Sequence, residues 1–383
     1  MNADAKTVLL VDDAPANLQV VNSILKSTYK IRIATSGEKA LKMANQSPAP
    51  DLILLDVMMP EMDGYEVCSR LKAATDTRDI PVIFLTGQTE VDEETKGFEV
   101  GAVDYIHKPF SPAIVKARVH THLLLRGMRE QLASQLLTLQ QEMETARQIQ
   151  LSILPREIPS LHGLDVAVRY IPMTSVAGDF YDFIVIDEKR MGILVADVSG
   201  HGMPAALISS MLKIALATQT GCASDPASVL AGLNQALYGK FQGHFVTAAY
   251  VLVDTGKQSI SYAGAGHPPL IFRDNSAGET REFVENGLVL GYFPDATYTS
   301  INIPFKEGDW GVVYTDGITE TTNLSEEQFG VDRFKLFLQI HHDLSAGQLV
   351  DKLLDELSRW SDTASGREPE DDITLLAFHF NVR

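Results

Sequence analysis

The chain has 383 residues, 45% of them hydrophobic and 21% charged, which is typical of folded domains rather than of disorder. Its length favours two domains over one. The net charge of −18 argues against binding to nucleic acid or anionic lipid, because both depend on cationic side chains. No signal region precedes the first strand and no apolar run approaches the ~20 residues of a membrane span, so we expect a cytoplasmic protein that does not enter the membrane.

Residues 7–125 alternate short apolar runs with amphipathic runs, which predicts a parallel, doubly wound α/β sheet. The expected strands are Thr7–Val11, Ile31–Ala34, Leu52–Asp56, Val82–Thr86 and Asp104–His107. Ligands collect at the carboxyl ends of such strands, so the polar residues there should form one site. They are Asp12, Asp13, Asp56, Thr86 and Lys108.

This set of residues is suited to phosphoryl chemistry. Its three carboxylates can hold Mg²⁺, which prefers oxygen ligands. Asp56 can then accept a phosphoryl group as an acyl phosphate. Lys108 can pair with the phosphoryl charge, and the Thr86 hydroxyl can hydrogen-bond to it. The Lys108–Pro109 bond is a candidate cis peptide.

The motifs at these positions resemble those of two-component receiver domains. They are Val11-Asp12-Asp13, Leu55–Gly64, Leu85-Thr86-Gly87 and Lys108-Pro109-Phe110. The resemblance predicts a receiver domain over residues 1–124 and implies that a sensor histidine kinase phosphorylates Asp56. It also implies a switch in which Thr86 moves toward the phosphoryl group and Tyr105 reorients. The alternative is a receiver that has lost this chemistry and only holds a partner.

Apolar residues between Ile114 and Leu154 recur in steps of three and four. They are Leu125, Met128, Leu132, Leu136, Leu139, Met143 and Ala146. The spacing predicts a continuous helix of ~40 residues, roughly 60 Å long, with one apolar seam. We expect residues 125–155 to be a helical linker that forms a parallel coiled-coil homodimer. The alternative is a helix that lies on a neighbouring part of its own chain.

Residues 156–383 combine many strands with a few helices, which predicts an α+β layered β-sandwich. The expected strands include Asp165–Tyr170, Phe183–Ile186, Met191–Asp197, Phe245–Val253, Ser259–Tyr262, Leu270–Phe272, Ile301–Phe305 and Gly311–Thr315. The expected helices are Pro204–Ala217, Pro226–Phe241, Val331–Gln339 and Ala346–Ser361. Acid-bearing turns around Asp179, Asp197, Asp316 and Asp371 lie at strand junctions. Oxygen ligands converging from distant segments are what a hard divalent metal ion requires.

The motifs in these turns resemble the metal-dependent protein phosphatase (PPM) family, in its sporulation and sigma-factor-regulating branch. They are Ala146–Gln150 with Leu154-Pro155, Gly178–Asp182, Ala196–Gly202, Gly264–Pro269, Thr315–Glu320 and Asp371–Thr374. Ala177 departs from this pattern, because the family often has a glycine there.

The PPM resemblance implies two Mn²⁺ or Mg²⁺ ions at one end of the sandwich. Asp197 would bridge both metals and Asp179 would help to hold one of them. Asp316 and Asp371 would hold the other, with the backbone carbonyl of Val198 as a further ligand. The choice between Asp371 and Asp372 as the direct ligand stays open.

Two histidines of these motifs, His201 and His267, could act as acids or touch substrate, although a structural role in their turns is favoured. Asp182 could orient a ligand from behind the metal centre.

Together the two halves predict a response regulator with a metal-dependent protein serine/threonine phosphatase as its output. The branch resemblance implies a phosphorylated anti-sigma-factor antagonist as the substrate. One alternative is a catalytically silent adaptor that binds a sigma-factor regulator. Another is an enzyme that hydrolyses a small phosphoester.

Overall fold

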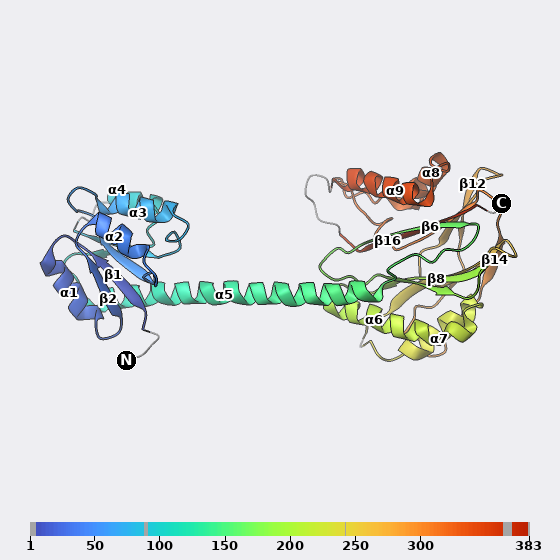
Figure 1. Ribbon diagram of the computed structural model, residues 1–383, viewed down its shortest axis with the longest axis horizontal. Coiled ribbons are helices and arrows are strands. Elements are labelled where there is room, and N and C mark those ends of the chain that lie inside the picture. Colours follow the sequence, from blue (N-terminus) through green and yellow to red (C-terminus); the bar gives the residue numbers. More distant parts are fainter. Residues whose placement is uncertain (1–4, 88–90, 242, 363–369, 382–383) are drawn as a thin grey trace. The chain divides into compact units, whose positions relative to one another are not determined.

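The computed structural model describes residues 5–87, 91–241, 243–362 and 370–381 (Figure 1). The chain divides into two compact units, Met1–Leu139 and Gln140–Arg383. The three domain ranges given above stay a prediction. None of the helices in the described ranges has the length and apolar character needed to cross a bilayer.

The first unit contains a five-stranded parallel sheet with the order β2-β1-β3-β4-β5, which confirms the predicted α/β architecture. Its strands are β1 (Thr7–Val11), β2 (Lys30–Ala34), β3 (Leu52–Asp56), β4 (Val82–Thr86) and β5 (Asp104–His107). Its helices are α1 (Pro15–Leu25), α2 (Gly37–Ala44), α3 (Gly64–Ala73), α4 (Val91–Glu99) and the first part of α5 (Pro112–Ile153). The central strands β3 and β4 are buried along their whole length, so both faces of the sheet need helices.

Two apolar cores occupy the two faces of this sheet. One lies beneath α2 and α3, and the other lies beneath α1 and the start of α5. Side-chain caps fix where two of the helices begin: Ser36 caps α2, and Asp63 accepts a 2.8 Å hydrogen bond from the backbone N–H of Glu66 in α3. The carboxyl ends of the strands, where the polar residues lie, are thereby held at one edge.

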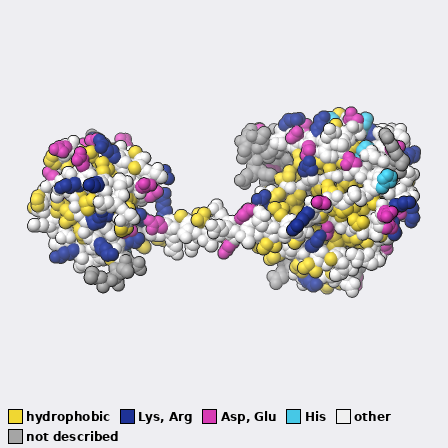
Figure 2. Space-filling view, in the orientation of Figure 1, with side chains coloured by type: hydrophobic (Ala, Val, Ile, Leu, Met, Phe, Trp, Pro, Cys, Tyr) yellow, Lys and Arg dark blue, Asp and Glu magenta, His cyan; other side chains and the backbone are white. Residues whose placement is uncertain are grey.

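Helix α5 runs without interruption over 42 residues, within two residues of the predicted bounds. At 1.5 Å per residue its length is roughly 60 Å. Figure 2 shows yellow apolar side chains among polar ones along its exposed part. Five seam residues are more than half exposed: Leu125, Met128, Leu132, Leu136 and Leu139. The coiled coil that this seam predicts stays a prediction.

The second unit contains two sheets. The first has the order β13-β10-β9-β8-β7 with β14 paired to β10, and the second has the order β12-β11-β15-β16-β6. The strands of the first sheet are β7 (Phe180–Val185), β8 (Arg190–Val198), β9 (Val246–Asp254), β10 (Ser259–Ala265), β13 (Asn286–Gly287) and β14 (Ile301–Pro304). The strands of the second are β6 (Leu164–Ile171), β11 (Leu270–Asp274), β12 (Glu279–Phe283), β15 (Trp310–Tyr314) and β16 (Ile373–Phe380).

Helices cover the outer faces of these sheets. They are α6 (Met203–Ala217), α7 (Pro226–Leu237), α8 (Gly330–Ile340) and α9 (Ala346–Ser361), and a 3₁₀ turn, η1 (Thr220–Cys222), follows α6. One apolar core lies between the two sheets, a second lies under α6 and α7, and a third lies under α8 and α9. Figure 1 shows the α6–α7 pair and the α8–α9 pair on opposite sides of the sheets.

The structure differs from the expected elements of the second unit in several places: β7 begins at Phe180 rather than Phe183, and β12 and β13 were not expected. The helix from Pro226 ends at Leu237 rather than Phe241, because Tyr238 leaves helical geometry and Gly239 has a φ of +71°. The expected strands also omitted β16, whose apolar run lies inside the second sheet and pairs with both β15 and β6.

Candidate functional site

The carboxyl edge of the first unit's sheet brings three carboxylates together. Ligand atoms of Asp12, Asp13 and Asp56 lie within 4.8 Å of one another, the one such trio in the described residues. Asp12 and Asp56 are buried, whereas Asp13 is exposed to solvent. This geometry suits a hard cation that keeps part of its coordination shell open.

Lys108 lies between the two buried carboxylates. Its ammonium nitrogen, Nζ, is 3.0 Å from an oxygen of Asp12 and 3.0 Å from an oxygen of Asp56. Burial raises the pKa of Asp56 and the nearby Asp12 adds to this, while the Lys108 hydrogen bond opposes it. Burial by itself would lower the pKa of Lys108, but the hydrogen bonds to Asp56 and Asp12 raise it overall. The ammonium group is therefore held charged beside the candidate phosphoacceptor.

The other predicted residues of this edge lie close by in the fold. Thr86 ends β4 and is buried, and its backbone carbonyl accepts a 2.8 Å hydrogen bond from the N–H of Lys108. The Lys108–Pro109 peptide is cis, as predicted. Tyr105 is buried against Phe98, with ring centroids 4.8 Å apart.

Two features of this edge were missed from the sequence. The Asn17 side chain donates hydrogen bonds of 3.1 and 2.9 Å to the two oxygens of Asp12. A side chain at Gly64 would come within 2.2 Å of the Asp56 carbonyl oxygen, so only glycine leaves that backbone in place. Two signals were available in the sequence: Asn17 follows Asp12 by five residues, and Gly64 follows a turn.

In the second unit, five acids lie around one end of the sandwich. Asp179 precedes β7, Asp197 is the penultimate residue of β8, and Asp316 follows β15. Asp371 and Asp372 precede β16. These positions lie in or next to strands of both sheets, so the acid cluster bridges the two sheets at that end.

Burial and mutual repulsion act on these acids. Burial, with Asp316 and Asp371 next in importance, raises the pKa of Asp197 to about 7. Burial and Asp371 raise the pKa of Asp316 to about 6. Within the part of the chain that the structure describes, none of the five acids forms a salt bridge with Lys or Arg. These carboxylates repel one another, and no described Lys or Arg side chain neutralises them. A set of oxygen donors of this kind suits divalent metal ions.

Two threonines fix Asp179, which is fully buried. Its Oδ2 accepts hydrogen bonds of 2.8 Å from the Thr315 hydroxyl and 2.6 Å from the Thr374 hydroxyl. The Thr315 hydroxyl oxygen in turn accepts a 2.8 Å bond from the backbone N–H of Thr374. Thr315 directly follows β15 and Thr374 lies in β16, both in the second sheet, whereas Asp179 leads into β7 of the first sheet. These bonds therefore join the two sheets at the acid cluster.

Asp371 and Asp372 differ in their surroundings. Asp372 is buried, and its two oxygens accept backbone N–H bonds of 2.7 Å from Met173 and 2.6 Å from Gly178. Asp371 is exposed, and one of its oxygens accepts a 2.7 Å bond from the N–H of Asp372. Gly317 packs so closely that a side chain there would lie 2.1 Å from the Asp372 carbonyl oxygen. The geometry therefore favours Asp371 as the residue with oxygens available to a ligand.

The two histidines of the motifs are unlike each other. His201 is exposed in the turn after β8. His267 is buried, its Nδ1 lies 2.9 Å from the Thr247 hydroxyl, and burial lowers its pKa to about 3. Thr247 pairs with Asp197 across β8 and β9, so a neutral His267 supports the strand that carries this acid. Asp182, for its part, pairs with Lys213 of α6 at 2.7 Å.

Gln150, near the end of α5, belongs to the Ala146–Gln150 motif, but no role was predicted for it. It is buried, and its side-chain amide exchanges two hydrogen bonds with the backbone of Ala177, at 2.6 and 3.0 Å. It also donates a 3.1 Å bond to the Ser209 hydroxyl of α6. Ala177 lies two residues before Asp179, so the helix end is bonded to the segment that carries an acid. The available signal was its place at the end of that motif, four residues after the seam residue Ala146.

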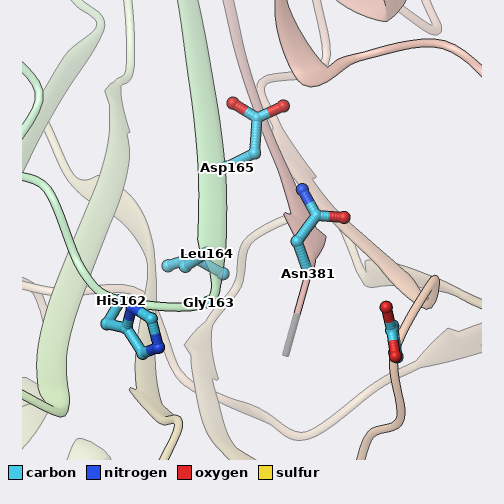
Figure 3. A pocket seen from close by; sticks show the side chains of 6 residues that line it. His162, Gly163, Leu164, Asp165 and Asn381 are labelled. Carbon is cyan, nitrogen blue, oxygen red and sulfur yellow. The ribbon is translucent and has the colours of Figure 1, made fainter. Parts of the chain in front are cut away.

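A separate pocket of about 610 Å³ lies at the opposite end of β6 and β16 (Figure 3). It is lined by His162, Gly163, Leu164, Asp165, Glu307 and Asn381. The strand register pairs Phe380 with Leu164 at that end and Ile373 with Ile171 at the acid end. The seven intervening steps span roughly 23 Å at 3.3 Å per residue, so this pocket is no part of the acid cluster.

Fold and site together define a receiver joined to a metal-dependent phosphatase-type domain. Residues 8–120 match the response regulator receiver domain, and residues 187–381, just over half of the chain, match Stage II sporulation protein E (SpoIIE). The chain belongs to the SpoIIE family.

Individual relatives agree with this division. Phosphoserine phosphatase RsbU of Bacillus subtilis is 29% identical over 68% of this chain and 74% of its own length. The SiaA-PP2C domain of Pseudomonas aeruginosa superposes with a TM-score of 0.58 and 26% identity, over 65% of this chain and 99% of that domain. A probable cyclic di-GMP phosphodiesterase of Vibrio cholerae is 47% identical over 34% of this chain, but this chain spans only 29% of that relative.

The hydroxyl clamp on Asp179 makes a testable prediction. In Thr374→Val the shape is kept but one of two hydroxyl donors to a buried carboxylate is lost, so Mn²⁺ affinity should fall by about 10- to 100-fold. Titration of the full chain with Mn²⁺ measures this. Thr255→Val, at an exposed hairpin hydroxyl, is the matched control and should bind Mn²⁺ normally. Equal affinity in both variants would contradict the role of the clamp.

Proposed function

We propose that this chain is a response regulator that accepts a phosphoryl group on Asp56 and thereby controls a metal-dependent protein serine/threonine phosphatase. The single observation that carries the proposal is the pair of carboxylate sites, one in each compact unit, each built at strand ends. Membership of the SpoIIE family and similarity to a phosphoserine phosphatase support the activity of the second unit.

In the first unit, Asp12, Asp13 and Asp56 would hold Mg²⁺. An oxygen of Asp56 attacks the phosphorus of a phosphohistidine on a sensor kinase, and the bond between phosphorus and the histidine nitrogen breaks. Lys108, charged and already 3.0 Å from Asp56, pairs with the incoming negative charge. The Thr86 hydroxyl then hydrogen-bonds to a phosphoryl oxygen.

In the second unit, Asp197 would bridge two Mn²⁺ or Mg²⁺ ions, and Asp179, Asp316, Asp371 and the Val198 carbonyl would complete the ligand set. The bound ions would supply an acidified water and positive charge for the phosphate of the substrate. Asp372 accepts hydrogen bonds from the backbone of the loop before Asp179, so Asp371 would be the metal ligand. The protein needs no serine or cysteine nucleophile for this hydrolysis.

The proposed substrate is a phosphorylated anti-sigma-factor antagonist, dephosphorylated on serine or threonine. The support is the resemblance to the sigma-factor-regulating branch and the phosphoserine activity in the name of RsbU. An acidic second unit does not argue against a protein substrate, because the positive charge for phosphate would come from the metal ions.

The proposed route of control is α5. The helix begins in the first unit and ends in the second with Gln150 bonded to the backbone of Ala177. A rotation or shift of this helix would move the segment that leads to Asp179. Phosphorylation of Asp56 would act by changing the helix position. The simpler outcome is that it activates the phosphatase.

We also propose that the chain is a homodimer through the exposed seam of α5. Leu132, Leu136 and Leu139 are each more than half exposed on a helix that has no core of its own over this stretch. A second copy would remove these side chains from water, which is the driving force for a parallel coiled coil.

The phosphatase assignment predicts the behaviour of Asp197→Asn. With Mn²⁺ and a phosphoserine protein, its activity should fall at least about a hundredfold, because the proposed bridging carboxylate is lost. Phosphoryl uptake on Asp56 should persist. Asp187→Asn, in an exposed hairpin, is the control and should keep full activity. Retained turnover in Asp197→Asn would contradict the assignment of Asp197 as a metal ligand. A wild-type protein that binds metal but has no activity would favour the alternative of a catalytically silent adaptor.

The coupling makes a second prediction. Loading an acyl-phosphate mimic such as beryllium fluoride onto Asp56 should raise the rate of phosphoserine hydrolysis, and Asp56→Asn should remove the response. Gln150→Ala should also remove it, whereas the exposed neighbour in Gln148→Ala should leave it intact. If the mimic does not change the rate of the wild type, the phosphatase assignment would stand but control by Asp56 would be refuted.

The dimer makes a third prediction. Sedimentation of the full chain should give twice the monomer mass, and Leu132→Asn with Leu139→Asn should give monomers because polar groups enter the seam. Gln131→Asn with Gln140→Asn, off the seam, should stay dimeric. A monomeric wild type at micromolar concentration would support the alternative of a helix that packs on its own chain.

A further inference from the structure

A cavity of about 310 Å³ lies in the first unit, between the α3–β4 connection and α5. Pro81 comes directly before β4 and Val103 directly before β5, so the cavity opens at the amino ends of these strands. The phosphoacceptor residues follow the carboxyl ends of the same sheet. The cavity is therefore separate from the site at Asp56.

Four cationic side chains line this cavity, although the protein as a whole carries a charge of −18. They are Lys72, Arg78, Arg126 and Arg129. The acid in the lining is Asp79, at 3.7 Å from Arg78 and 3.5 Å from Arg129, and exposed pairs of this length contribute little.

Two of the cations are held in place mainly by neutral acceptors. Lys72 donates to the carbonyls of Arg78 and Ile80, at 2.9 and 2.7 Å. Arg126 donates to two carbonyls before β3, at 3.2 and 2.9 Å, and pairs with Glu130 at 2.7 Å. Four cations against the carboxylates of Asp79 and Glu130 leave an excess of two positive charges. Burial is the main cause of the lowered pKa of Lys72; Cys68 and Asp79 oppose the shift, and Arg126 and Arg129 add to it more weakly.

The remaining titratable group is already engaged. His122 lies 3.0 Å from Asp104, which also pairs with Arg118. Burial lowers the pKa of His122, which favours its neutral form. The excess positive charge of the cavity is therefore available to an anion.

Part of the cavity lining is apolar. Pro81, Val103 and Leu125 form this part, and Val103 and Leu125 are partly exposed rather than packed in the core. A volume near 300 Å³ with a few convergent polar groups is within the range of small-molecule sites. Cationic and apolar side chains in one lining match a ligand that has a phosphate group at one end and a planar or apolar group at the other.

We infer that this cavity binds an organic phosphate of nucleoside monophosphate size. The phosphate lies against Arg78 and Arg129, whose guanidinium groups are exposed and can form charge-assisted hydrogen bonds. The base or other apolar part lies on Pro81, Val103 and Leu125. Since α5 supplies one wall and the α3–β4 connection the other, the ligand fastens the start of the linker helix to the receiver sheet.

Calorimetric titration of the full chain with AMP, adenosine and inorganic phosphate tests this inference. A chelator removes divalent metal beforehand, so that neither carboxylate site attracts phosphate. AMP should bind with saturation and more tightly than phosphate or adenosine, because only AMP engages both parts of the cavity. The double variant Arg78→Gln and Arg129→Gln should weaken AMP binding by about tenfold or more, because charge-assisted bonds are lost.

The matched control is the double variant Lys26→Gln and Lys116→Gln. It removes the same charge from exposed positions of the first unit that do not line the cavity. It should bind AMP as the wild type does. No saturable AMP binding at millimolar concentration, or equal weakening in both double variants, would overturn the inference. Equal affinity for AMP and inorganic phosphate would overturn the role of the apolar lining residues.

Discussion

Both units depend on carboxylates that the fold holds close together in spite of their repulsion. In the receiver, Lys108 supplies part of the opposing charge, and it contacts Asp12 and Asp56 at equal distance. In the second unit no protein cation does so among the described residues, and the pKa of Asp197 rises to about 7. A buried cluster of this kind is costly without metal ions, so the scaffold around it must be rigid.

Rigidity at the acid cluster comes from hydrogen bonds between the sheets. Thr315 and Thr374 hold Asp179, while Asp372 holds the backbone at Gly178. Each bond satisfies a buried polar group, and each links a strand end of one sheet to a loop of the other. Because buried polar networks stabilise only when every member is satisfied, a disturbance at one member is transmitted to the others.

The linker helix connects this network to the receiver. Gln150 satisfies both backbone groups of Ala177, so the position of α5 and the position of the acid-bearing loop are not independent. At its other end the helix forms one wall of a cationic cavity with Arg126 and Arg129. Phosphorylation at Asp56, a second copy along the seam and an anion at this cavity would thus all act on one structural element.

The sequence by itself predicted most of the elements and the residue types of each candidate site. Apolar residues that recur every two residues, or every three to four, predicted the five receiver strands, α5 and most of the second unit. They could do so because such patterns are local in the sequence. Motifs such as the turn at Asp197 gave residue types for the sites. The tertiary structure decided which residues support them: Asn17 on Asp12, Thr374 on Asp179, and Gln150 on Ala177. These pairs join segments that only the folded chain brings together, and neither periodicity nor spacing encodes such distant contacts.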